Sequence, residues 1–132
     1  MSIFHGRGYV YSLQYHLVWC VKYRRKVLVN EVEKSLKEII IELCKDHEIV
    51  IEEMETDKDH IHMLISLKPQ HFIPSVVKTL KGQSARRLFK LHPEIKKILW
   101  GGHLWNPSYF IATISEKTEV QVRRYIQNQK QK

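Results

Sequence analysis

The chain has 132 residues, 43% of them hydrophobic and 10% aromatic, which is enough for a packed core and argues against disorder. Its formal net charge is +8. The N-terminus has no signal-peptide pattern and no apolar run approaches the roughly 18 residues that span a bilayer, so we expect one cytoplasmic domain over residues 1–132, without a membrane partner.

The predicted elements alternate between strands and helices. Apolar and aromatic residues alternate with Gln14 and His16 in the first strand, and Asn30 supplies an N-cap signal for the first helix. In chain order we expect a strand at 9–21, a basic turn at 22–26, a helix ending near His47, a hairpin of strands 48–55 and 60–67 with a turn at 56–59, a helix from Ile73-Pro74 to His92-Pro93, a chain break at Gly101-Gly102, a strand at 108–114, and a helix through Val122, Tyr125, Ile126 and Gln129. This βαββαβ order predicts an α+β fold: a ferredoxin-like antiparallel sheet with an added C-terminal helix that contains the tyrosine.

Two histidines stand one residue apart in the strand predicted at 60–67. Because side chains alternate along a strand, His60 and His62 share one face, while Ile61 and Met63 share the core face. Imidazoles about 7 Å apart along a pleat can converge on one cation. The alternative is a pair of histidines on the wet face of a strand. The sequence contains no HExxH, GxxxxGK[ST] or GxSxG motif, which excludes the zincin, P-loop and α/β-hydrolase interpretations.

The last helix offers a phenol and an amide on one face. Tyr125 and Gln129 are four residues apart, so their Cβ atoms lie about 5–6 Å apart and both side chains can reach one site. Gln121 is also four residues from Tyr125, so spacing alone does not choose between the two glutamines. The alternative is that Tyr125 belongs to an apolar stripe with Val122 and Ile126.

Charge is unevenly distributed along the chain. Residues 31–59 contain 11 of the 14 acidic residues and 4 basic ones, whereas the rest of the chain contains 18 basic residues and 3 acidic ones. This segregation indicates a basic surface that faces a polyanion such as DNA or RNA. The alternative is an ordinary protein of high isoelectric point with solvated lysines. Cys20 and Cys44 lack the CxxC spacing of a zinc knuckle and are expected to be buried.

Four motifs in order carry a resemblance to a known family. They are HIH at 60–62 after a short acidic turn, LKGQSARRL at 80–88, LWNPSYF at 104–110 and YIQNQ at 125–129. Over nearly its whole length the chain resembles the single-tyrosine HUH transposases of the IS200/IS605 family. The resemblance implies that His60 and His62 bind a divalent cation, Mg²⁺ or Mn²⁺. It also implies that Tyr125 is the nucleophile and that Gln129 is a third metal ligand.

The resemblance further implies a substrate and a subunit arrangement. The substrate is single-stranded DNA with hairpins near the ends of an insertion sequence, cleaved through a 5′-phosphotyrosine intermediate and rejoined. The assembly is a homodimer in which each active site combines the histidines of one subunit with the tyrosine helix of the other. An unblunted strand edge at residues 10–20 could pair across the two-fold axis. Where family members often have a glycine hinge before the tyrosine helix, this chain has Ser115-Glu116-Lys117.

The second helix is expected to contact DNA. Opposite its apolar stripe lie basic residues, the interior Gly82 and Phe89, which could stack on a base; a merely solvated amphipathic helix is the alternative. Gly82 costs roughly 1 kcal/mol relative to alanine in a helix, which suggests a packing or ligand requirement. The candidate DNA-binding residues are Lys78, Lys81, Gly82, Arg86, Arg87 and Lys90 of this helix, Lys22, Arg24 and Arg25 of the basic turn, and Arg123 beside the tyrosine.

Two other functions remain open from the sequence. A REP-associated tyrosine transposase performs related chemistry on genomic repeat hairpins, and those proteins are usually longer at the C-terminus. A ferredoxin-like nucleic-acid binding module would bind DNA with solvated histidines and cleave nothing. Trp105 and Asn106 are expected to be structural under every interpretation.

Overall fold

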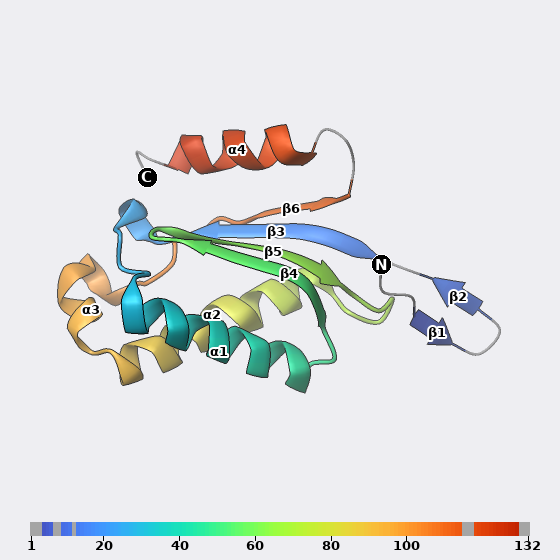
Figure 1. The fold of residues 1–132 in the computed structure, drawn as a ribbon, viewed down its shortest axis with the longest axis horizontal. Helices are drawn as coiled ribbons and strands as arrows, with labels where there is room; N and C mark the ends of the chain where they lie inside the picture. The colour runs from blue at the N-terminus through green and yellow to red at the C-terminus, as the bar shows by residue number, and fades with distance from the viewer. Residues whose placement is uncertain (1–3, 7–8, 12, 115–117, 130–132) are drawn as a thin grey trace.

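The computed structural model describes residues 4–6, 9–11, 13–114 and 118–129 (Figure 1). Ser115-Glu116-Lys117, which stand where family members often have a glycine hinge, lie outside these residues. The elements are β1 (Phe4–Gly6), β2 (Tyr9–Tyr11), β3 (Gln14–Cys20), the 3₁₀ turn η1 (Lys22–Arg24), α1 (Asn30–Asp46), β4 (Val50–Asp57), β5 (His60–Ser66), α2 (Ile73–Leu91), α3 (Glu94–Ile98), the 3₁₀ turn η2 (Trp100–Gly102), β6 (Phe110–Thr113) and α4 (Thr118–Asn128).

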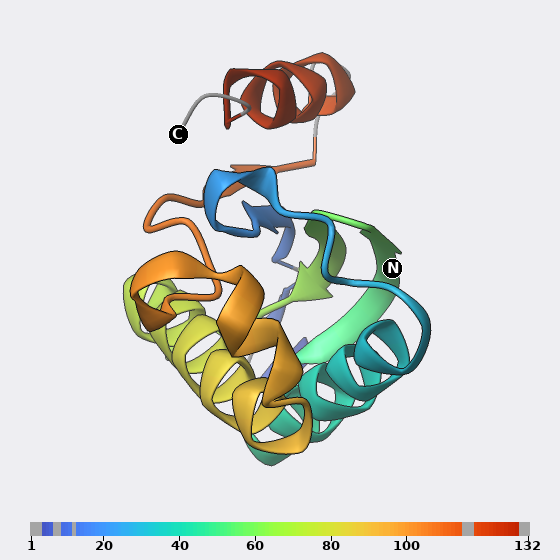
Figure 2. The same ribbon diagram turned by 90° about the vertical axis from the view of Figure 1, so that its left-hand side faces the viewer.

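The central sheet has the strand order β4-β5-β3-β6, with antiparallel neighbours throughout. This is the order that a ferredoxin-like βαββαβ chain produces, so the predicted fold class is confirmed. Helices α1 and α2 cover one face of the sheet, and α4 crosses the opposite face (Figures 1 and 2). None of the described helices is long and apolar enough to cross a membrane.

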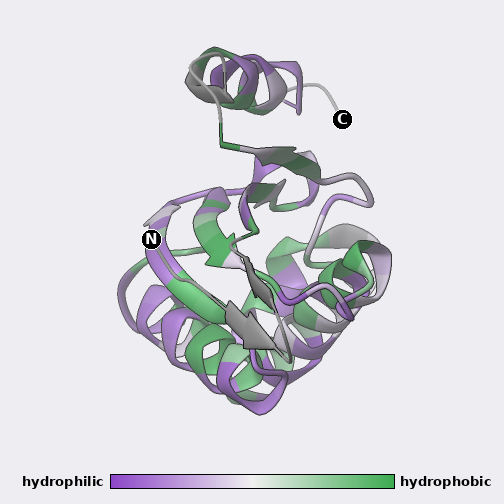
Figure 3. Cartoon of the chain, turned by 90° about the vertical axis from the view of Figure 1, so that its right-hand side faces the viewer, coloured by the Kyte–Doolittle hydropathy of each residue, from purple (hydrophilic) through white to green (hydrophobic). Residues whose placement is uncertain are grey.

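The core lies between the sheet and the α1–α2 layer. Leu17 and Trp19 of β3 and Ile61 and Met63 of β5 are fully buried there, as the alternation of side chains along a strand requires. Hydrophilic residues lie mainly on the outside of the helical layer (Figure 3). The indole of Trp105 packs edge-on against Trp19 with ring centroids 5.7 Å apart, and donates to Ser84 Oγ at 3.0 Å. The expected structural role of Trp105 is confirmed.

The long first strand predicted at 9–21 is wrong as a single element. β2 pairs with β1 in a separate two-stranded sheet, and β3 begins at Gln14 in the main sheet. β3 is also not the open edge predicted within 10–20, because β5 pairs along one side of it and β6 pairs with residues 15–18 on the other. Alternation predicts an extended chain but does not reveal where the chain changes pairing partners.

Two smaller expectations are corrected. The hairpin turn is tighter than predicted, because β4 continues to Asp57. The N-cap position of α1 is occupied by Val29 without a side-chain cap, while Asn30 has a φ of +52°. Phe89 is half-buried against the core and lies near the Lys96 ammonium, and its stacking on a base stays a prediction. The predicted break at Gly101-Gly102 is confirmed, since both residues have positive φ angles, 78° and 70°.

Candidate active site

The two histidines lie on the face of β5 that points away from the core, the face that α4 covers (Figure 1). Across the antiparallel pair with β3, His60 is opposite Cys20 and His62 is opposite Val18. On the other side, His62 is opposite Glu55 of β4. Both imidazoles are partly exposed, so a ligand can reach them.

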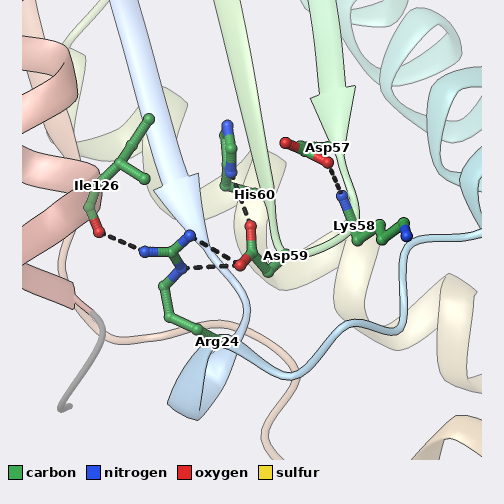
Figure 4. A network of polar contacts seen from close by, with 6 residues as sticks. All are labelled: Arg24, Asp57, Lys58, Asp59, His60 and Ile126. Atoms are coloured by element: carbon green, nitrogen blue, oxygen red, sulfur yellow. Dashed lines mark hydrogen bonds and ion pairs between the residues drawn. The ribbon is translucent and has the colours of Figure 1, made fainter.

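Asp59 holds the imidazole of His60. His60 Nδ1 donates to Asp59 Oδ1 at 2.8 Å, and Arg24 donates to Asp59 Oδ2 from Nε at 3.0 Å and from Nη2 at 2.8 Å (Figure 4). Burial alone would raise the pKa of the Asp59 carboxyl, but the hydrogen bonds from His60 and Arg24 and their charges lower it below its ordinary value. An ionised carboxylate on Nδ1 leaves Nε2 of His60 for a ligand.

His62 has a histidine neighbour on β3. His16 Nδ1 and His62 Nε2 are 2.8 Å apart and share one hydrogen bond, with the ring centroids 5.1 Å apart. Burial, followed by the charge of His16, lowers the pKa of His62 below its ordinary value. His62 is therefore neutral at physiological pH, and the neutral imidazole is the form that ligates metals.

Tyr125 and Gln129 meet at Ser108. The Tyr125 hydroxyl is 2.9 Å from Ser108 Oγ, and Ser108 Oγ lies 3.2 Å from Gln129 Oε1 and 2.8 Å from Asn106 Oδ1. The two amide oxygens can only accept, so Ser108 gives its single proton to one of them and Tyr125 donates to Ser108. Among the described residues the structure gives Tyr125 no hydrogen bond to either strand histidine.

The Tyr125 phenol is protonated in this arrangement. Burial raises its pKa above the ordinary value, and the hydrogen bond with Ser108 opposes that effect in part. Cys20 lies near both His60 and Tyr125. It is opposite His60 in the sheet, and its charge would raise the pKa of Tyr125. Burial raises the pKa of the Cys20 thiol to about 11, so it stays protonated and is no rival nucleophile.

The side chains present fit a hard divalent cation. His60 and His62 offer imidazole nitrogens from one strand face, and Gln129 offers an amide oxygen from the end of α4, a set that Mg²⁺ or Mn²⁺ can complete with phosphate oxygen and water. Within the described ranges no group of three or more histidine, cysteine, aspartate or glutamate side chains is gathered as a metal site. A closed structural zinc site is therefore not present in that part of the chain.

Gly82 faces an open groove of about 350 Å³ on α2, and a Cβ added there would meet nothing within 4 Å. Packing against the described residues therefore does not require this glycine, and its contact with a ligand stays a prediction. The groove is lined by Lys22, Lys81, Gly82, Ala85, His103, Trp105, Asn106 and Pro107. Lys81 Nζ donates to the carbonyl oxygens of Asn106 and Ser108 at 2.6 and 2.9 Å, and burial lowers its pKa to about 8.

The remaining basic candidates differ in how freely they can meet a phosphate. Lys78, Lys90 and Arg25 are exposed. Arg86 is hydrogen-bonded to Gln83, and Arg87 pairs with Glu42 of α1 at 3.2 Å. Arg123 is exposed beside the tyrosine. Arg24 has its guanidinium turned inward, toward Asp59 and α4 (Figure 4).

Three residues near the site were not singled out from the sequence. Asp59 is adjacent to His60, and an acidic residue before the histidine motif was a usable signal. His16 lies on the polar face of its strand, but only the register of β3 against β5 brings it to His62. Ser108 has no spacing relation to Tyr125, so no sequence pattern could have joined them.

Comparison with known proteins shows the family of the chain. Residues 9–129 match the family described as "Transposase IS200 like", so the chain is a DNA transposase of the single-tyrosine class. It is 53% identical to the ISDra2 transposase TnpA of Deinococcus radiodurans over 127 residues, which cover 96% of this chain and 91% of the relative. It is 30% identical to the transposase for insertion sequence element IS200 of Salmonella typhimurium over 128 residues, covering 97% and 82%. The chain belongs to the IS200-like transposase family.

Solved structures show the same fold. A crystal structure of a transposase from Deinococcus radiodurans superimposes with a TM-score of 0.91 at 48% identity, covering 96% of this chain and 97% of that one. A REP-associated tyrosine transposase bound to a REP hairpin superimposes with a TM-score of 0.60 at 18% identity, covering 93% and 68%. The second similarity concerns the fold alone.

Proposed function

We propose that this transposase cleaves and rejoins single-stranded DNA hairpin substrates through Tyr125, and that the reaction requires Mg²⁺ or Mn²⁺ bound by His60 and His62. The observation that carries the proposal is that β5 and α4 present an imidazole pair and a phenol on the same side of the sheet. An ordinary nucleic-acid binding sheet needs neither group there.

The side chains suit a reversible strand transfer. The Tyr125 hydroxyl loses its proton to solvent as its oxygen attacks phosphorus. The bond from phosphorus to the 3′ oxygen breaks, and the 3′ oxygen takes a proton from solvent and leaves as a hydroxyl. Ser108 accepts the hydrogen bond of the phenol before attack. A phenol is a tolerable leaving group, so an incoming 3′-hydroxyl can attack the 5′-phosphotyrosine and release Tyr125. No external energy source is needed.

The residues around the proposed cation have separate roles. When bound, the cation offsets the negative charge of the scissile phosphate and aligns its oxygens. Asp59 orients His60 through Nδ1. His16 is hydrogen-bonded to Nε2 of His62, so His62 would give up this bond to bind the cation through Nε2. Gln129 is the proposed third ligand, and it would leave Ser108 to reach the cation.

The DNA is proposed to lie along α2 and the groove beside Gly82. Exposed Lys78 and Lys90 can neutralise phosphates, and the bare backbone at Gly82 permits close approach. Lys22, Lys81, Arg25, Arg86, Arg87 and Arg123 are the further candidates. A hairpin substrate is supported by the REP-associated relative, whose structure was solved with a REP hairpin.

We further propose a homodimer with composite active sites. Within one chain the Tyr125 hydroxyl contacts Ser108, a position from which neither strand histidine is hydrogen-bonded among the described residues. A helix supplied by the partner would complete the site while the chain's own histidines hold the cation. This arrangement is also what the family resemblance implies.

Labelled single-stranded hairpin DNA from the flanking ends of the element, incubated with Mg²⁺, provides the test. Wild type should form a covalent protein–DNA adduct, and Tyr125→Phe should form none while binding the hairpin normally. His60→Ala should likewise keep hairpin binding and lose cleavage, because the metal ligands and the basic helix are separate surfaces. Normal cleavage by His60→Ala at limiting Mg²⁺ would disprove the ligand assignment.

The rival functions predict different results in the same assay. A non-catalytic binding module would bind the hairpin and give no adduct with any cation. A REP-associated enzyme would form the adduct on genomic repeat hairpins in preference to the ends of an insertion sequence. The presence of paired histidines and Tyr125 on one face favours a cleaving enzyme over the binding module.

A further inference from the structure

Arg24 connects the histidine strand to the tyrosine helix. Its side chain is 14% exposed, and it makes two hydrogen bonds to Asp59 Oδ2 in the turn between β4 and β5. The remaining guanidinium nitrogen, Nη1, donates to the backbone carbonyl of Ile126 in α4 at 2.6 Å (Figure 4). One guanidinium therefore joins three segments that are far apart in sequence.

The backbone that presents Arg24 is strained. Tyr23 and Arg24 both lie in the left-handed region, with φ angles of 57° and 53°. Each such residue is unfavourable relative to a right-handed conformation, and it persists only where the surrounding structure holds it. Here Val21 N donates to the carbonyl of Asp59 at 2.8 Å, so the strained turn is tied to the segment that Arg24 contacts.

The two ends of the Arg24 contacts matter for different reasons. Asp59 uses its second oxygen to accept from His60, so the position of the guanidinium is passed on to that imidazole. Ile126 follows Tyr125 directly and lies in the last turn of α4, where backbone carbonyls lack partners within the helix. A cation is favourable at that end of a helix.

We propose that Arg24 is a positioning residue for both halves of the active site: through Asp59 it fixes the His60 imidazole, and through the Ile126 carbonyl it docks the tyrosine helix. The role in metal loading rests on the proposed function, while the docking role is independent of it. Lysine cannot replace Arg24, because a single ammonium does not reproduce the planar fork that makes these three bonds.

Hydrogen exchange of the full chain, followed by mass spectrometry, tests the docking role. Amides of residues 118–128 should exchange about tenfold faster in Arg24→Gln, the effect of losing a charge-assisted hydrogen bond, while β3 and β5 keep wild-type protection. Arg24→Lys keeps the charge, but amide exchange of residues 118–128 should be nearly as fast in it as in Arg24→Gln. Lys34→Ala, which removes an exposed charge from α1 on the other side of the sheet, is the matched control and should match wild type.

Two further comparisons separate positioning from a general structural role. Asp59→Asn should also speed exchange in α4, and the double variant with Arg24→Gln should be no faster than Arg24→Gln alone, because the two residues act as one unit. Wild-type exchange in α4 of Arg24→Gln would overturn the proposal. So would equal acceleration in α4, β3 and β5.

Mn²⁺ binding to the DNA-free protein, measured from the spin-resonance signal of unbound Mn²⁺, tests the link to His60. Arg24→Gln and Asp59→Asn should weaken Mn²⁺ binding by about 10- to 100-fold relative to wild type and Lys34→Ala. Equal Mn²⁺ affinity in wild type and Arg24→Gln would overturn the link to His60. Absence of Mn²⁺ binding in wild type would instead refute the proposed metal-dependent function, and hydrogen exchange would still decide the docking role.

Discussion

Ser108 is the hydrogen-bond partner of Tyr125, the proposed nucleophile. The Ser108 hydroxyl oxygen accepts a hydrogen bond from the Tyr125 hydroxyl. When the phenol ionises, the Ser108 hydroxyl can turn its proton from the Asn106 amide oxygen toward the phenolate. That hydrogen bond works against the burial that raises the pKa of Tyr125. A small hydroxyl therefore influences how much phenolate is available at a given pH.

Ser108→Ala is expected to slow single-turnover cleavage about tenfold at neutral pH, the factor that corresponds to one hydrogen bond of about 1.4 kcal/mol. Loss of the bond leaves burial unopposed, so the Tyr125 pKa rises and the pH–rate profile should move to higher pH. Hairpin binding should not change. Ser75→Ala, on an exposed position at the start of α2, is the control. An unshifted profile would remove Ser108 from any role in Tyr125 ionisation.

At the scale of elements, α2 shows a conflict between stability and function. Gly82 lies inside a 19-residue helix, where glycine is less favourable than alanine, and yet no atom of the described residues requires its small size. The groove beside it is open and flanked by Lys22 and Lys81. A helix that keeps a destabilising residue beside a basic groove is expected to do so for a ligand.

Gly82→Ala should stabilise the free protein by about 0.5–1 kcal/mol, since helix propensity improves and the new methyl group meets no obstacle. The midpoint of urea unfolding measures this gain. The same variant should bind hairpin DNA more weakly in a mobility-shift titration, because the methyl group keeps the phosphate backbone from the helix. Higher stability with unchanged hairpin affinity would place the DNA elsewhere.

Elements could be predicted from the sequence where their signals are local. The helical spacing of apolar residues predicted α1 and α2. The alternation of side chains along β5 predicted that His60 and His62 share one face. The break between β2 and β3 could not be predicted, because it depends on which strand pairs with which. The same limit hid the contact of His16 with His62 and that of Arg24 with α4, since both depend on tertiary structure.

At the scale of the whole molecule, the position of α4 determines how many chains an active site needs. In a single chain α4 rests on its own sheet, tied by Arg24 at one end and with Tyr125 at Ser108. A symmetric dimer can exchange such a helix between subunits without any new contact type. If α4 stays on its own sheet, the histidines and the tyrosine of one site come from the same chain. If the helices are exchanged, the histidines come from one chain and the tyrosine from the other.

Mixing two inactive variants distinguishes these arrangements. If sites are composite, a heterodimer of His60→Ala and Tyr125→Phe contains one site with both defects and one intact site. Random reassortment then restores about a quarter of the sites. If each chain uses its own tyrosine, every site in the mixture has a defect and no adduct forms. Co-refolding the variants in equal amounts and counting covalent adducts on labelled hairpin DNA measures the fraction directly. A silent mixture, with heterodimers confirmed by mass, would rule out the composite site in favour of catalysis within one chain.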